Sequence, residues 1–361
     1  MALYSGDSMP TWSLNNPLLS LVLVVLGGAA MVRTAPRFGS HRGRAASLTL
    51  LGLALASFAN AYFSYLPRLG DVVGPRPWPV ASYQSVSGLG VAAPRSVKPA
   101  KGAVVTVVVP GRRSGISPRA AMVYLPPQYF SQPTAHFPVL YLLHGSPGLP
   151  VDWFRGGEAA TAGLAAATAG TPVILVAPKM SSGWLSDSEC IDRRSDRWET
   201  YLTDDVVPAV DARFRTQAAA TGRGLAGNSA GGYCALAVGL RHPTLFRSIA
   251  ALSPLTEPTY SYGSLSQLFE HPADLPAALA SHRPLWLLQH KAGALREHIR
   301  LDVGNADSVA PSVRAFAAAD RALGGRPLLV VRDGGHTFRV WRPALLEAVL
   351  WFGRDQRGTT S

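Results

Sequence analysis

The chain has 361 residues, of which 47% are apolar and 16% charged, and its formal net charge is +12. This composition fits a globular domain with membrane segments added. A basic exported domain would be attracted to anionic lipid headgroups or wall polymers, although solvated surface charge explains the same excess. Nucleic acid is disfavoured as a partner, because no clustered basic helix or aromatic–basic repeat accompanies the charge.

Two uncharged apolar runs near the N-terminus predict two transmembrane helices, at about residues 14–32 and 46–66. The loop between them, 33–45, is basic and is expected to stay in the cytoplasm of a bacterial cell. The lipid bilayer is therefore an expected partner, and everything after Leu66 is expected outside the cytoplasm. A cleaved signal peptide is the alternative for the second run, and a buried helical hairpin is the alternative for the pair.

Residues 67–101 are rich in Pro, Gly and Ser and predict a linker. From residue 102 to 354 the pattern alternates between strands and helices, which predicts a mostly parallel sheet flanked by helices. The first two strand runs, 103–109 and 120–125, are expected to form a hairpin. Further strands are predicted at 138–143, 172–176, 248–252 and 327–331, and helices at 158–169, 199–214, 312–323 and 341–352. Residues 355–361 are expected to be a flexible tail.

A serine between small residues follows another short strand run, in Gly227-Asn-Ser229-Ala-Gly231. An apolar helical run, 233–240, comes directly afterwards. The order strand, G-x-S-x-G turn and helix is typical of the nucleophile elbow of α/β-hydrolases. The strained turn demands residues without bulk on both sides of the serine. A glycine-rich turn without chemistry is the alternative, so the other site residues must decide.

A serine nucleophile needs a histidine base and a carboxylate, in the chain order Ser, acid, His for this fold. His336 follows the last strand run and two glycines, Gly334 and Gly335, which allow a tight loop. Asp307 follows the strand run 299–303 and is the predicted acid. Asp302 is the competing candidate, although its place within the strand favours a structural bond.

Stabilisation of an oxyanion requires two backbone N–H groups aimed at the developing charge. Ala230, immediately after the nucleophile, should supply one of them. Ser146, in the loop His144-Gly-Ser146-Pro-Gly148, should supply the other, and His144 is expected to orient that loop. Aromatic residues border the expected site, and Trp153, Trp184 and Tyr260 are the candidate substrate contacts.

The region from 102 to 352 resembles the esterase D-like branch of α/β-hydrolases, which holds feruloyl esterases, enterochelin esterases and mycolyltransferases. The resemblance rests on motifs in a matching order, and these are Tyr141–Gly145, Trp153, Trp198–Thr203, Gly227–Gly232, His242-Pro243, Gly304–Asp307 and Gly334–Phe338. Two departures from the mycolyltransferases are Asn228 before the serine and an aspartate where those enzymes use glutamate. The resemblance implies an acyl-enzyme on Ser229, with His336 protonating the leaving alcohol and Asp307 stabilising the imidazolium.

We therefore predict a serine esterase that acts on an ester outside the cytoplasm, with a lipid or glycolipid as a candidate substrate. The alternatives are an acyltransferase that moves an acyl chain onto a sugar, and a catalytically idle binding module on the same fold. Outside the cytoplasm Cys190 and Cys234 are expected to form a disulfide, with free buried thiols as the alternative. No cofactor is expected, and no metal site, because His and Cys residues lack ligand spacing.

Overall fold

The computed structural model describes residues 25, 41–66, 100–183, 186–260, 263–290 and 298–358. The chain divides into two compact units, which are described separately. One comprises residues 1–77 with 337–339, and the other comprises 78–336 with 340–361. The predicted linker, 67–101, lies outside the described residues except for its last two positions.

In the first unit, residues His41–Phe63 form helix α2. The helix begins before the predicted span 46–66 and includes the basic residues Arg42 and Arg44 in its first turn. The other predicted span, 14–32, lies outside the described residues apart from Val25. In the described part of the chain, no helix combines the length and the apolar character that crossing a membrane requires. The predicted span 46–66 is thus unsupported, and the predicted span 14–32 stays a prediction.

In the second unit, the described residues contain eight strands that form one sheet in the order β1-β2-β4-β3-β5-β6-β7-β8. The strands are β1 (Ala103–Val109), β2 (Arg119–Leu125), β3 (Val139–Leu143), β4 (Ile174–Pro178), β5 (Arg223–Asn228), β6 (Ser248–Leu252), β7 (Ile299–Gly304) and β8 (Leu328–Arg332). The pairs β1–β2 and β2–β4 are antiparallel, and every pair from β4 to β8 is parallel. The predicted hairpin and the mostly parallel sheet are confirmed.

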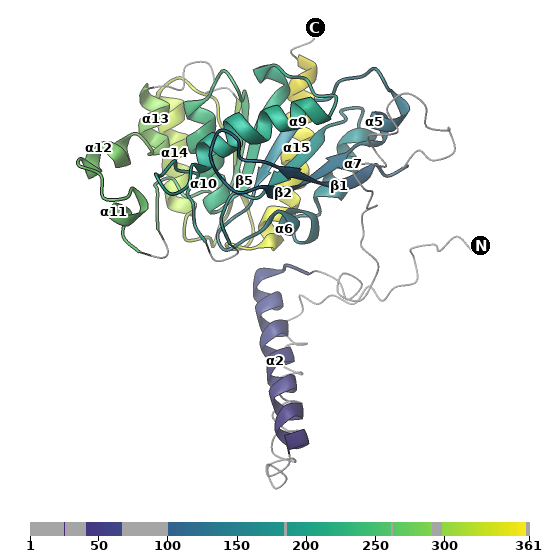
Figure 1. Ribbon diagram of the computed structural model, residues 1–361, viewed down its shortest axis with the longest axis vertical. Helices are drawn as coiled ribbons and strands as arrows, with labels where there is room; N and C mark the ends of the chain where they lie inside the picture. Colours follow the sequence, from purple (N-terminus) through teal and green to yellow (C-terminus); the bar gives the residue numbers. More distant parts are fainter. Residues whose placement is uncertain are drawn as a thin grey trace. The chain divides into compact units, whose positions relative to one another are not determined.

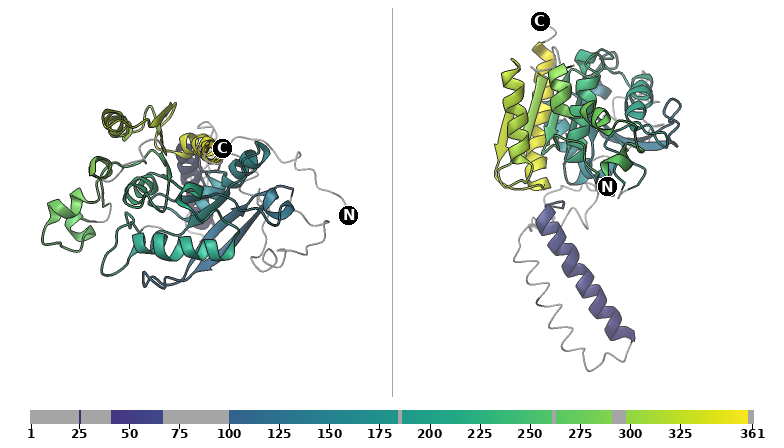
Figure 2. Two further views of the ribbon diagram at one scale, coloured as in Figure 1. Left: turned by 90° about the horizontal axis from the view of Figure 1, so that it is seen from above. Right: turned by 90° about the vertical axis from the view of Figure 1, so that its left-hand side faces the viewer.

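Most of the parallel strands are buried on both faces, as near-continuous apolar runs predict. Helices therefore cover the sheet on both sides (Figures 1 and 2). One face packs against α9 (Val207–Arg213), α10 (Ala230–Arg241), α13 (Pro284–His290) and α14 (Ala310–Ala322). The opposite face packs against α6 (Pro150–Arg155), α7 (Ala159–Thr168) and α15 (Phe338–Gly358). The fold is that of an α/β-hydrolase.

One predicted helix is divided in the structure, and five short helices were not predicted. The predicted helix 199–214 consists of α8 (Trp198–Thr200), a π-helical turn η3 (Tyr201–Val206) and α9. The short helices α5 (Pro127–Ser131), α11 (Leu265–Leu268) and α12 (Leu275–Ala280), together with α6 and α13, were not predicted. They are too short for an apolar period to show in the sequence.

The predicted flexible tail, 355–361, is wrong for its first four residues, because α15 continues to Gly358. The Asp355 carboxylate accepts a hydrogen bond from the Ser248 hydroxyl at 2.9 Å and lies 3.0 Å from His298 Nδ1. Gln356 is also buried. These contacts fix the end of the helix to β6 and to the start of β7.

The parallel strands place their carboxyl ends at one edge of the sheet, where ligands bind in such folds. Ser229 follows β5, Asp307 follows β7, and His336 follows β8. The topology alone therefore brings the three predicted catalytic residues to the same edge.

Candidate active site

Ser229 occupies the sharp turn between β5 and α10, with φ 55° and ψ −123°. A positive φ is strained for a residue with a side chain and is characteristic of functional turns. The flanking glycines are required by space. A Cβ atom added at Gly227 would overlap the Gly231 carbonyl oxygen, and one added at Gly231 would overlap the Leu143 carbonyl oxygen. The turn has the geometry of a nucleophile elbow.

The structure brings Ser229, His336 and Asp307 into one hydrogen-bonded line. His336 Nε2 lies 2.8 Å from the Ser229 hydroxyl oxygen. His336 Nδ1 lies 2.9 Å and 3.1 Å from the two carboxylate oxygens of Asp307. Since an ionised carboxylate only accepts, Nδ1 carries the proton toward Asp307 and Nε2 is free to accept the proton of the serine.

The two loops that carry Asp307 and His336 interlock after β7 and β8. The Ala306 N–H donates to the Gly334 carbonyl at 3.0 Å, and the Gly334 N–H donates to the Asn305 side-chain oxygen at 3.1 Å. Gly334 has φ 130°, which a residue with a side chain rarely adopts. A Cβ atom at Gly304 would overlap the Gly334 carbonyl oxygen. The glycines therefore let the loops approach closely enough for the acid to reach the imidazole.

The Asp307 carboxylate is fully buried, whereas the His336 ring is 35% exposed. Burial by itself would raise the pKa of Asp307, but the hydrogen bond with His336 and that from the Val309 N–H outweigh it, and the pKa lies below its ordinary value. The carboxylate is consequently ionised at neutral pH. The Trp341 ring meets the imidazole edge-on at 4.9 Å between centroids and restricts its rotation.

Asp302, the competing candidate for the acid, has a structural role. Its carboxylate is fully buried in β7 and accepts hydrogen bonds from Arg300 at 2.7 Å and from Arg332 at 2.6 Å. Both guanidinium groups also bind Glu347 of α15, each at 2.8 Å. The cluster joins β7, β8 and α15, and its two arginines engage both carboxylate oxygens of Asp302.

The predicted oxyanion loop passes beside the nucleophile. A Cβ atom added at Gly145 would lie 3.4 Å from Ser229 Cβ, so the loop after β3 runs close beside the elbow. The Ser146 hydroxyl on this loop is buried and has no hydrogen-bond partner among the described residues. Ala230 begins α10, where the first backbone N–H groups of a helix have no acceptor within the helix.

Of the three predicted substrate contacts, Trp153 is contradicted. Its side chain is 1% exposed because the inner face of α6 packs it into the protein, so it contributes to the core. Trp184 lies outside the described residues. Tyr260 is half-buried in the loop after β6, where it interacts with Arg193 of the loop after β4. Tyr260 is thus the one predicted aromatic contact that lies among the described residues and is partly accessible.

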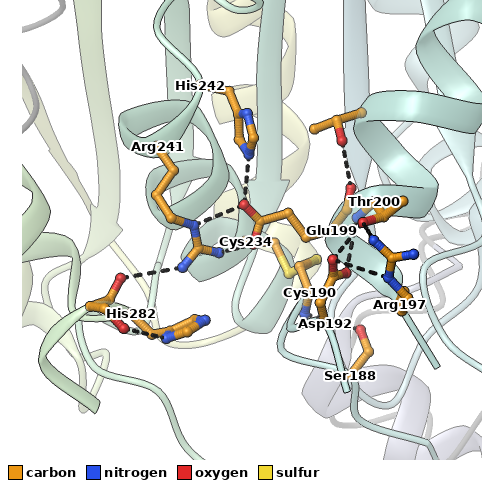
Figure 3. A network of polar contacts seen from close by, with 12 residues as sticks. Ser188, Cys190, Asp192, Arg197, Glu199, Thr200, Cys234, Arg241, His242 and His282 are labelled. Carbon is orange, nitrogen blue, oxygen red and sulfur yellow. Dashed lines mark hydrogen bonds and ion pairs between the residues drawn. A yellow bond between two sulfur atoms is a disulfide. The ribbon is translucent and has the colours of Figure 1, made fainter. Parts of the chain in front are cut away.

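A disulfide joins Cys190, in the loop after β4, to Cys234 in α10. Beside it lies a polar cluster that sequence reasoning missed: the Glu199 carboxylate binds Arg241 at 2.9 Å and His242 at 2.6 Å (Figure 3). The only signal for this cluster was the pair of motifs at 198–203 and 242–243. Among the described residues, no group of three or more His, Cys, Asp or Glu side chains could hold a metal ion.

Comparison with known proteins decides the family. A family model described as putative esterase matches residues 117–352. The chain belongs to this putative esterase family. A protein of Corynebacterium glutamicum described as uncharacterised is 30% identical over 336 residues, which cover 88% of this chain and 77% of its own. An esterase of Mycobacterium tuberculosis is 32% identical over 154 residues, or 42% of this chain, and the match spans 33% of the length of that relative. As a member of the putative esterase family, the chain is a carboxylic ester hydrolase.

Solved structures share the esterase fold. A ferulic acid esterase has a TM-score of 0.61 and 24% identity, covering 70% of this chain and 97% of its own. The fluorophosphonate-binding serine hydrolase F of Staphylococcus aureus, with substrate bound, has a TM-score of 0.59 and 18% identity, covering 70% and 98%. The protein MPT51 of Mycobacterium tuberculosis has a TM-score of 0.54 and 17% identity, covering 69% and 97%. At these identities the likeness establishes the fold.

Proposed function

We propose that the chain is a serine esterase in which Ser229 is the nucleophile, His336 the general base and acid, and Asp307 the orienting carboxylate. The observation that carries the proposal is the continuous line from Asp307 through His336 to the Ser229 hydroxyl, with 2.9 Å and 2.8 Å between the bonded atoms. A serine hydroxyl becomes a nucleophile when an adjacent base takes its proton. The line has the geometry for that transfer.

In the acylation step, the Ser229 oxygen attacks the ester carbonyl carbon while its proton moves to His336 Nε2. The carbonyl oxygen becomes an oxyanion, which the N–H groups of Ser146 and Ala230 stabilise. The ester C–O bond then breaks, and His336 gives its proton to the leaving alcohol. Asp307 stays ionised throughout and stabilises the imidazolium.

In the second step, His336 takes a proton from water as the water oxygen attacks the acyl-enzyme. Collapse of the second tetrahedral intermediate breaks the bond to Ser229, His336 returns its proton to the Ser229 oxygen, and the acid is released. The unpaired Ser146 hydroxyl supports a substrate at this loop, because a buried hydroxyl without a partner costs about 1 to 3 kcal/mol. A bound ester would offer the missing acceptor.

The experiment is hydrolysis of a panel of p-nitrophenyl esters of increasing chain length, together with labelling by a fluorophosphonate probe. We expect the wild type to hydrolyse short or medium esters and to take one label, and Ser229→Ala to do neither. An unlabelled wild type without ester hydrolysis would support the idle binding module instead. Adding trehalose to the same assay tests the acyltransferase alternative, since transfer would yield an acylated sugar in place of free acid.

We further propose that the catalytic domain acts outside the cytoplasm. The Cys190–Cys234 disulfide supports this location, because such bonds persist in oxidising compartments and are rare in the cytosol. Reporter fusions after residues 45 and 66 test it in cells. If a reporter that is active only in the cytoplasm is active after residue 66, the extracytoplasmic location is excluded. The lipid or glycolipid substrates that this location suggests would then lose their support.

A further inference from the structure

A line of buried polar contacts links the oxyanion loop to the loop after β4. His144 Nδ1 lies 2.9 Å from the Gly145 carbonyl oxygen, and the Met180 N–H donates to His144 Nε2 at 3.1 Å. The Ser188 hydroxyl donates to the Met180 carbonyl at 2.6 Å, and the Cys190 N–H donates to the Ser188 hydroxyl at 3.1 Å. All five residues are at least nine-tenths buried or lie on buried backbone.

The proton of each contact is fixed by its chemistry. A backbone N–H can only donate, so His144 Nε2 is an acceptor, and the proton of the neutral ring sits on Nδ1 facing the Gly145 carbonyl. Burial lowers the pKa of His144, which keeps the ring neutral. The donors therefore all point the same way along the line, an arrangement in which hydrogen bonds strengthen one another.

The far end of the line is covalently attached to the nucleophile elbow. Cys190 is bonded to Cys234, which lies in the first turns of α10, five positions after Ser229 (Figure 3). The Tyr233 N–H donates to the Ser229 carbonyl at 3.0 Å. Because Cys234 is the next residue, the disulfide is attached to the part of α10 that directly follows the nucleophile. The line thus starts at the loop of one proposed oxyanion donor, Ser146, and ends at the helix of the other, Ala230.

We propose that Ser188 and the Cys190–Cys234 disulfide are positioning groups for the oxyanion hole, because they set the spacing between these two donors. The inference rests on the proposed esterase function. In a trans peptide the N–H lies opposite the preceding carbonyl. Because His144 binds the Gly145 carbonyl, it directs the Ser146 N–H to the opposite side. Met180 binds His144, and Ser188 and the disulfide fix the position of Met180 with respect to α10.

Neither Ser188 nor the disulfide touches the reacting atoms, so their effect is indirect. A displacement of about 1 Å in a catalytic group can cost about a hundredfold in rate. The displacement should weaken binding of the tetrahedral intermediate, which both donors contact, and leave binding of the ground-state ester unchanged. The distinguishing signature is therefore a lower kcat with an unchanged KM.

The first arm of the test compares Ser188→Ala and Ser188→Thr with the matched control Ser182→Ala. Ser182 lies in the same loop, is exposed, and bonds only to the Ser186 hydroxyl among the contacts recorded for its side chain. Kinetics on a p-nitrophenyl ester should show a fall of about tenfold or more in kcat for Ser188→Ala, with KM within about twofold. The threonine variant, which keeps the hydroxyl, should recover most of the rate, and Ser182→Ala should match the wild type.

The second arm removes the disulfide through the double variant Cys190→Ser with Cys234→Ser, and in the wild type through dithiothreitol, which reduces the disulfide to two thiols as it is itself oxidised. Intact mass after alkylation reports the thiols. Both treatments should lower kcat, and reoxidation of the reduced wild type should restore it. Affinity for an alkyl boronic acid, which forms a tetrahedral adduct with the serine, should fall in parallel with kcat.

A purely structural role would lower the melting temperature while kcat of the folded enzyme and boronic acid affinity stayed at wild-type values. That outcome, for either Ser188→Ala or the double variant, would overturn the proposal. Failure of the proposed esterase function can be distinguished from failure of this proposal. In that case the wild type itself would take no fluorophosphonate label and cleave no ester, before any variant is compared.

Discussion

Asp302 and Asp307 lie in and just after the same strand, β7, and both carboxylates are fully buried, yet their partners differ. Asp302 is bound by Arg300 and Arg332, whose guanidinium groups do not lose their protons in proteins. Asp307 is bound by His336, a ring that is partly exposed and can exchange a proton. Burial and hydrogen bonding alone thus do not mark a catalytic acid. The chemistry of the partner separates the scaffold carboxylate, Asp302, from the proposed catalytic one, Asp307.

The largest expected effect falls on the residues that exchange the proton. Ser229→Ala or His336→Ala should lower kcat about 10⁴-fold or more, because the nucleophile or its base is lost. Neither change should lower the melting temperature, since the serine turn is strained and the histidine ring is partly exposed. Steady-state kinetics with thermal melts would check both, and a variant that kept a tenth of the wild-type rate would contradict the roles assigned.

The comparison predicts that Asp307→Asn loses rate more than stability. An amide can present its N–H₂ group to His336 Nδ1 and favour the wrong tautomer, so kcat should fall about 10⁴-fold. Circular dichroism and chemical unfolding should show a folded protein. Nearly wild-type turnover would mean that another carboxylate orients the histidine.

Asp302→Asn is the matched substitution and should do the reverse. Removing the carboxylate leaves Arg300, which is 4% exposed, without its main partner in the sheet. Breaking a buried ion pair typically costs about 3 to 5 kcal/mol. Urea unfolding should register this loss, while kcat per folded enzyme stays within about twofold of the wild type. A large loss of kcat without loss of stability would reverse the two assignments.

The smallest effect is expected at Glu347, the exposed member of the Arg cluster. Hydrogen bonds from Arg332, followed by those from Arg300, lower its pKa from 4.5 to about 2. Since the pKa of the folded state is the lower one, the carboxylate stabilises the fold above pH 4.5, and this contribution disappears as the pH falls toward about 2.

Because the Glu347 side chain is 46% exposed, solvent screening limits the contribution to about 1 kcal/mol. Glu347→Gln should therefore be less stable than the wild type at pH 7, with the gap narrowing as the pH falls from 4.5 toward about 2. Urea unfolding across this range measures the gap. A gap that does not depend on pH would show that packing, and not charge, is responsible.

The parts of the fold that the sequence predicted are those with a strong local signature. The strands 103–109 and 248–252 are predominantly apolar runs with the predicted bounds. The elbow at Ser229 and the glycines before His336 carry steric requirements that only small residues meet. Chain order then distinguished Asp307 from Asp302, because one follows the strand and the other lies inside it.

The parts that were missed depend on contacts between distant segments. Nothing near Trp153 indicates that its face of α6 turns toward the core, since an aromatic residue can pack in a core or line a substrate wall. The bond from Asp355 to Ser248 joins residues that are 107 positions apart, so the end of α15 could not be read from its polar composition. The cluster of Glu199, Arg241 and His242 likewise exists only after folding.

The most direct measurement of the central claim is the intact mass of the enzyme quenched with acid within milliseconds of mixing with p-nitrophenyl acetate. We expect one added acetyl group on the wild type, located on Ser229 by peptide mapping, no addition to Ser229→Ala, and a slower appearance of the adduct in Asp307→Asn than in Asp302→Asn. An acetyl group on another residue, or wild-type ester hydrolysis that persists in Ser229→Ala, would contradict the account.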